Sequence, residues 1–88
     1  MGRLPAETGV RTLLIDPGRP KRVYVVSEAS AVYRSDDSGE SWAPATQGLP
    51  DGGVETFALD PRLPQRLYAA TPAGAVYVSE DGADSWRR

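Results

Sequence analysis

SDDSGESW, residues 35–42, is followed one period of 44 residues later by SEDGADSW, residues 79–86. The similarity extends outward from both segments in the same register. Nearly half of the positions from Gly9 to Trp42 are identical to their counterparts in Gly53 to Trp86, without a gap. Self-similarity at a fixed period of this length indicates a repeat architecture. The 88-residue chain therefore contains two copies of one unit.

Each copy has the pattern of short strands separated by turns, with no helical period of useful length. In the first copy the expected strands are Val10–Asp16, Val23–Ser27, Ala31–Ser35 and a fourth that opens at Trp42; in the second they are Val54–Asp60, Leu67–Thr71, Ala75–Ser79 and a fourth from Trp86. Four strands in a period of about 40–45 residues are typical of a β-propeller blade. We therefore expect an all-β fold with two four-stranded antiparallel blades.

The segment from Ser35 to Trp42 resembles the Asp-box, or BNR, motif of Ser, any, Asp, any, Gly, any, any and an aromatic residue. The Asp carboxylate of such a turn can accept backbone N–H groups, the Gly takes a positive φ, and the aromatic ring anchors the turn. The second copy carries Ala83 at the glycine position, so either Ala83 is strained or Gly82 takes the positive φ. The eight motif positions are Ser35, Asp37, Gly39 and Trp42 in the first copy and Ser79, Asp81, Ala83 and Trp86 in the second.

The resemblance to bacterial BNR-repeat propellers implies closed rings of six, seven, eight or ten blades. Such families include sialidases, xyloglucan-active glycosidases, photosystem assembly factors and sortilin-type receptors, so the fold does not fix the function. Their Asp-boxes lie on the face opposite the active site, which implies a structural role for Asp37 and Asp81. The alternative is a hard cation or a substrate held by Asp36, Asp37 and Glu40, although these lack the oxygen spacing of an EF-hand loop.

Composition excludes several classes of function. There is no cysteine and no histidine, which removes disulfides, thiolate–zinc sites, cysteine nucleophiles and histidine bases. The net charge is −2 with no basic block, so a nucleic-acid partner is not expected. No apolar run is long enough for a membrane span or a signal peptide. We expect no cofactor and no metal. The scarcity of Asn, Gln and Met fits either a thermophile or a GC-rich genome.

Two blades leave two apolar faces uncovered, since a blade is normally covered on both sides by its neighbours. We expect residues 9–50 to form blade 1, residues 51–88 to form blade 2, and residues 1–8 to complete the outer strand of a neighbouring blade. The expected partner is the chain itself, as a trimer or tetramer that closes a ring of six or eight blades. A designed or evolutionary-model propeller unit is compatible with such a ring. The alternative is a fragment of a longer propeller.

Candidate ligand contacts are few. The acids Glu7, Glu28 and Asp51 lie on loops expected at the functional face, where they are either ligand contacts or solvated charges. Arg11 and Glu55 occupy equivalent positions near the start of the innermost strands. They either line the central channel and pair across adjacent blades, or are ordinary exposed charges. The tyrosines at repeated strand positions are expected to pack between blades: Tyr24, Tyr33, Tyr68 and Tyr77.

We therefore expect a non-catalytic structural or binding subunit that works by assembling, with no catalytic residue. The alternative is a carbohydrate-active propeller, a glycosidase or a lectin-like protein, whose site forms only in the closed ring. A platform for protein interaction is a third class. The ligand and the cellular compartment are not indicated by the sequence.

Overall fold

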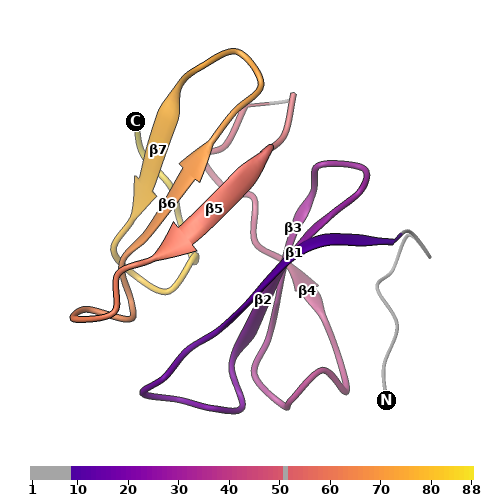
Figure 1. The fold of residues 1–88 in the computed structure, drawn as a ribbon, viewed down its shortest axis with the longest axis vertical. Coiled ribbons are helices and arrows are strands. Elements are labelled where there is room, and N and C mark those ends of the chain that lie inside the picture. The colour runs from indigo at the N-terminus through magenta and orange to yellow at the C-terminus, as the bar shows by residue number, and fades with distance from the viewer. Residues whose placement is uncertain (1–8, 51) are drawn as a thin grey trace.

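The computed structural model describes residues 9–50 and 52–88, and within them it contains seven strands and no helix (Figure 1). One antiparallel sheet, blade 1, has the order β1-β2-β3-β4; the second sheet, blade 2, has the order β5-β6-β7. The all-β class is confirmed. The strands are β1 (Val10–Ile15), β2 (Val23–Ser27), β3 (Val32–Ser35), β4 (Ala43–Pro44), β5 (Thr56–Leu59), β6 (Leu67–Ala70) and β7 (Val76–Ser79).

The two blades share one strand register. In blade 1, Val23 pairs with Ser35 across β2 and β3, and in blade 2, Leu67 pairs with Ser79 across β6 and β7. These pairs lie one sequence period apart. Because register decides which face a side chain occupies, every repeated strand position points the same way in both blades.

Blade 2 differs from the expectation at its outer edge, where residues 52–88 form no fourth strand. Arg87 makes a single bridge with Val78, in which the Arg87 N–H donates to the Val78 carbonyl at 2.9 Å and the Val78 N–H donates to the Arg87 carbonyl at 2.7 Å. The Val78–Arg87 pair is equivalent to the Arg34–Ala43 pair between β3 and β4. In blade 2 it is a single bridge, whereas in blade 1 a second pair extends it into a strand. The expected role of residues 1–8 lies outside the described residues.

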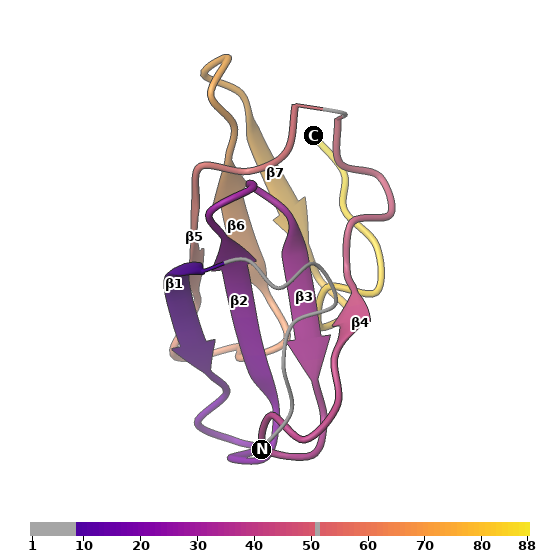
Figure 2. The same cartoon turned by 90° about the vertical axis from the view of Figure 1, so that its right-hand side faces the viewer.

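The connections between strands sort to two ends of the molecule. The β1–β2 and β3–β4 connections lie at the lower end in Figure 2, and the β2–β3 connection lies at the upper end. The linker from β4 to β5 rises along the edge of blade 1 and crosses at that upper end. Among the described residues there is no helix of the length and apolarity needed to cross a membrane.

The main core is the seam between the blades. Tyr24 of blade 1 meets Phe57 of blade 2 edge to face, with ring centroids 6.3 Å apart and an angle of 88° between the planes. A second, smaller cluster lies on the other side of blade 1, where Val25 and Tyr33 pack with Trp42. Because the larger cluster is built from both sheets, the blades stabilise each other. The buried members of the seam are Tyr24, Val26, Val32, Ala45, Val54, Phe57, Leu67, Ala69, Ala83 and Trp86.

Candidate functional site

Residues 35–42, turn 1, form a hairpin organised by one carboxylate and one hydroxyl. The Ser41 N–H and Ser41 Oγ donate to the two oxygens of Asp37 at 2.9 and 2.5 Å. Ser35 Oγ also donates to Asp37 Oδ1, at 2.7 Å, and accepts the Gly39 N–H at 2.8 Å. Buried Ser35 and exposed Asp37 thereby satisfy backbone donors that the turn would otherwise leave unpaired.

Residues 79–86, turn 2, repeat this network with matching bonds. Ser85 N–H and Oγ donate to Asp81 at 2.9 and 2.6 Å. Ser79 Oγ donates to the same carboxylate at 2.8 Å and accepts the Ala83 N–H at 2.9 Å. The two turns are therefore one local structure built from two different sequences.

Both turns place two consecutive residues at positive φ. In turn 1 these are Ser38 at 63° and Gly39 at 90°; in turn 2 they are Gly82 at 68° and Ala83 at 71°. The sequence left open whether Ala83 or Gly82 would take the positive φ, and the structure assigns it to both. Each turn thus has one glycine and one residue that carries the steric cost of the left-handed region, in exchanged order.

Hydrogen bonding also changes the acidity of the turn carboxylates. The bonds from Ser41 and Ser35 lower the pKa of Asp37 from 3.8 to about 2. The bond from the Ser85 side chain likewise lowers the pKa of Asp81. Both carboxylates are therefore ionised at neutral pH and already accept donors from their own turns.

The two motif tryptophans lie in different surroundings. Trp86 is buried in the seam, where its Nε1–H donates to the Ala45 carbonyl at 2.8 Å and its backbone N–H donates to the Gln47 carbonyl at 2.8 Å. Trp42 is half-buried against the smaller cluster of blade 1. Turn 2 is thus fastened to the chain of blade 1, whereas turn 1 faces away from blade 2.

The Arg34 side chain of blade 1 also binds turn 2, across the seam. Arg34 Nη1 donates to the Gly82 carbonyl and to Asp84 Oδ1, each at 2.7 Å. Its Nη2 lies 3.5 Å from Asp36 Oδ2 of its own blade. The Arg34 side chain is 21% exposed, so this ion pair is partly shielded from water. One residue therefore links the outer strands of blade 1 to the turn of blade 2.

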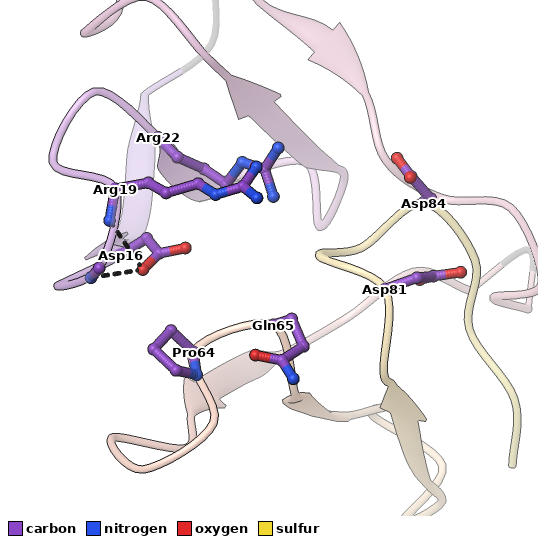
Figure 3. A pocket seen from close by; sticks show the side chains of 8 residues that line it. Asp16, Arg19, Arg22, Pro64, Gln65, Asp81 and Asp84 are labelled. Carbon is purple, nitrogen blue, oxygen red and sulfur yellow. Dashed lines mark hydrogen bonds between the residues drawn. The ribbon is translucent and has the colours of Figure 1, made fainter.

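A polar cavity of about 490 Å³ lies between the blades, at the end of the molecule that carries the β1–β2 connection and turn 2 (Figure 3). Arg19 and Arg22 extend into it from blade 1 toward Asp81 and Asp84 on the opposite wall. Buried Asp16 accepts the Gly18 and Arg19 N–H groups at 2.8 and 3.2 Å. The lining residues are Asp16, Gly18, Arg19, Arg22, Pro64, Gln65, Asp81 and Asp84.

The charges of this cavity are mostly engaged in structural bonds. Arg22 Nε donates to Asp36 at 2.8 Å, and Asp84 accepts Arg34. The Tyr24 hydroxyl is buried beside the Arg22 guanidinium and lacks the geometry of a hydrogen bond, and this burial raises the pKa of Tyr24. These bonds leave few of the cavity's charged groups available to a ligand.

The structure shows local contacts of the two candidates for the central channel, Arg11 and Glu55. Arg11 donates to Ser30 Oγ at 3.4 Å and to the Glu28 carbonyl at 3.2 Å, both on its own blade. Exposed Glu55 is held by its backbone N–H, which donates to the Ala70 carbonyl at 2.8 Å. Pairing of Arg11 with Glu55 across blades stays a prediction.

The loop acids are placed only in part. Glu28 is exposed on the β2–β3 connection, whereas Glu7 and Asp51 lie outside the described residues. Within residues 9–50 and 52–88, no three acidic side chains gather as metal ligands. Sequence reasoning missed Arg34 and Asp84, although a position that breaks the repeat, arginine at 34 against valine at 78, was a usable signal.

Comparison with known proteins supports the fold. No protein-family model matches the chain, and no curated protein matches it either. Among solved structures, the chain is similar to the GH74 xyloglucanase from Xanthomonas campestris, with 25% identity over 91% of this chain and a TM-score of 0.70. It is also similar to a GH74 enzyme from Niastella koreensis, with 23% identity over 89% of this chain and a TM-score of 0.67.

The chain spans only 15% and 14% of those two proteins. Both are β-propeller enzymes, and the matching part corresponds to a small portion of each. The two sheets described above are therefore β-propeller-like blades.

Proposed function

We propose that the chain is a two-blade unit with a structural or binding role, which assembles head to tail with further copies into a closed propeller. One observation carries the proposal: three residues that are buried in the seam have equivalents that are exposed on the other blade. Val32 is fully buried, whereas Val76 is 59% exposed; Val54 is fully buried, whereas Val10 is 49% exposed. Tyr24 is fully buried, whereas Tyr68 is 40% exposed.

The two outer faces are copies of the two sides of the seam. Blade 1 contributes Leu14, Tyr24, Val26 and Val32 to the seam, and the equivalent positions on the outer face of blade 2 are Ala58, Tyr68, Ala70 and Val76. Blade 2 contributes Phe57, Leu59, Leu67, Ala69 and Tyr77, and the equivalent positions in blade 1 are Leu13, Ile15, Val23, Val25 and Tyr33. The outer face of blade 2 can therefore accept the outer face of blade 1 from a second copy.

The outer face of blade 2 also has a suitable shape and chemistry. It carries a depression of about 250 Å³. An exposed apolar surface of this kind is typical of an interaction site. The residues around the depression are Thr56, Phe57, Ala58, Tyr68, Ala69, Ala70 and Val76.

Head-to-tail contacts are heterologous and must close to avoid filaments. Two blades per chain give six blades from three copies or eight from four, both common for propellers. The turns resembling Asp-boxes then hold successive blades together, as turn 2 holds the seam through Trp86.

The test is native mass spectrometry of the whole chain and of two variants, each with one outer face charged. Val76→Asp blocks blade 2 and Leu13→Asp blocks blade 1, both at exposed positions. We expect a trimer or tetramer for the unsubstituted chain, monomers for each variant alone, and a 1:1 heterodimer when the variants are mixed. A monomer at all concentrations, or homodimers of either variant, would overturn the head-to-tail arrangement. Far-UV circular dichroism verifies that both variants are folded.

A second candidate is a carbohydrate-active propeller, favoured by the similarity to a xyloglucanase at 25% identity. Here the closed ring would bind or cleave a plant polysaccharide at the end that carries Glu28. The test is incubation of the assembled chain with xyloglucan, measuring both reducing ends and melting temperature. Release of reducing ends supports a glycosidase, a rise in melting temperature alone supports a lectin-like protein, and no change in either rejects this candidate.

A further inference from the structure

The outer edges of the two blades carry the same charged group on opposite members of an equivalent residue pair. In blade 1, Arg34 on β3 lies opposite Ala43 on β4. In blade 2, Val78 on β7 lies opposite Arg87. Arg34 and Val78 are repeat equivalents, as are Ala43 and Arg87. The arginine thus occupies the β3 position of the residue pair in blade 1 and the opposite position of the equivalent pair in blade 2.

An arginine at either position of the pair can bring its guanidinium to the same region beside the blade. Residues directly opposite in an antiparallel pair lie on the same face, with Cβ atoms about 4.5–5.5 Å apart. A long side chain from either strand can therefore deliver its charge to one region of space. From this region Arg34 binds turn 2, which belongs to blade 2, and blade 2 covers the face of blade 1 on which Arg34 lies.

Arg87 already makes the half of this clamp that lies within its own blade. Its Nη2 is 2.5 Å from Glu80 Oε1, and Glu80 also binds Arg66 at 2.7 Å. In blade 1 the equivalent acid, Asp36, binds Arg22 at 2.8 Å and lies near Arg34. Unlike Arg34, however, the Arg87 side chain is 68% exposed, on the edge of the outer face of blade 2.

We propose that Arg87 clamps turn 1 of a second copy, with the Glu40 carboxylate and the Ser38 carbonyl of that copy as its acceptors. Glu40 is the repeat equivalent of Asp84, and Ser38 is the equivalent of Gly82, the two residues that Arg34 binds. This inference rests on the proposed head-to-tail assembly and adds the charge pair that fixes its register. An apolar face alone specifies register poorly, whereas a guanidinium bound to a carboxylate and a carbonyl fixes both orientation and distance.

The test uses the single junction between the two blocked variants. The Leu13→Asp chain supplies blade 2 and receives Arg87→Ala; the Val76→Asp chain supplies blade 1 and receives Glu40→Ala. Dissociation constants of the four combinations, from isothermal titration calorimetry, form a double-mutant cycle. We expect each single change to weaken the heterodimer about tenfold, and the double change to weaken it by little more than either alone.

Charge reversal tests orientation in the same system. Arg87→Glu is expected to weaken the heterodimer by more than tenfold, and Glu40→Arg in the partner variant is expected to restore most of that loss. The matched control is Arg88→Ala, the next arginine along the chain, which loses the same charge and is expected to change the dissociation constant less than twofold.

The outcomes separate the two proposals. If the blocked variants form no heterodimer, the head-to-tail assembly is wrong and the clamp with it. If the heterodimer forms but Arg87 and Glu40 act additively, without rescue by charge reversal, the clamp is wrong and the assembly stands. Coupling between the two residues, with Arg88→Ala silent, is the result that supports the clamp.

Discussion

Blade 1 and blade 2 share the strand register of their first three strands, yet several equivalent residues lie in opposite environments. The tyrosine of β2 is buried and the equivalent tyrosine of β6 is exposed, because the seam covers opposite faces of the two sheets. Each blade therefore serves as an internal control for the other. A residue's contribution to stability is set by the face that is covered and not by its place in the repeat.

The largest effect is expected where the linker meets turn 2. Gly48 has a φ of +95°, and a Cβ there would lie 2.1 Å from the Trp86 carbonyl oxygen, a backbone atom that cannot yield. We expect Gly48→Ala to lower the free energy of unfolding by more than about 3 kcal/mol in urea titrations.

The control for this substitution is Gly74→Ala. Gly74 has a similar φ of +89° but no atom within 4 Å of an added Cβ, so only conformational strain of about 1 kcal/mol is expected. Equal losses for the two variants would show that Trp86 does not depend on the linker.

The next effect directly tests the contrast between buried and exposed positions. Val32→Ala removes two carbons from the seam and should lower the free energy of unfolding of the dilute chain by about 2 kcal/mol. Val76→Ala, at the equivalent exposed position, should change it by less than about 0.5 kcal/mol. Urea unfolding at low micromolar concentration measures both, and similar losses would contradict the contrast.

A smaller effect on the free energy of unfolding, of opposite sign in the two turns, is expected at the first positive-φ position, which is Ser38 in turn 1 and Gly82 in turn 2. Exposed Ser38 has a φ of 63°, so Ser38→Gly should relieve strain and raise the free energy of unfolding by about 0.5–1 kcal/mol. Gly82→Ser should lower it, because its Cβ would lie 2.6 Å from Arg22 Nη1 and its φ is 68°. Thermal melts of both variants check the signs, and a destabilising Ser38→Gly would refute the account of the turn.

The smallest effect is a dependence of stability on pH in the acid range. Bonds from Ser41 and Ser35 lower the pKa of Asp37 from 3.8 to about 2, so the stabilisation is complete above about pH 4 and is lost as the pH falls toward 2. Asp37→Asn should flatten the fall in unfolding midpoint between pH 4 and 2. Asp81→Asn should also flatten it, because the Ser85 bond lowers the pKa of Asp81. Urea midpoints at pH 5, 4, 3 and 2 provide the measurement.

The strands and turns could be predicted from the sequence because they depend on local chemistry. Alternating apolar residues, prolines between strands and the Ser-x-Asp spacing give the elements within one or two residues. In the described part of blade 2, the single bridge between Val78 and Arg87 in place of a fourth strand could not be predicted, since strand pairing depends on what lies beside Val78. Likewise, the break in the repeat at position 34 marks Arg34 as unusual, but its acceptors in turn 2 depend on which blade covers which face, and no local pattern contains that information.

The opposite burial of Trp86 and Trp42 also has a spectroscopic consequence. Trp86 is 5% exposed and bonded through its indole N–H, so its emission should stay blue and change only when the chain unfolds. Trp42 is half-exposed on the other side of blade 1, so its emission should shift to the blue when another blade covers that face. With Trp86→Phe, the fluorescence of a single indole becomes a direct signal of whether the outer face of blade 1 is occupied.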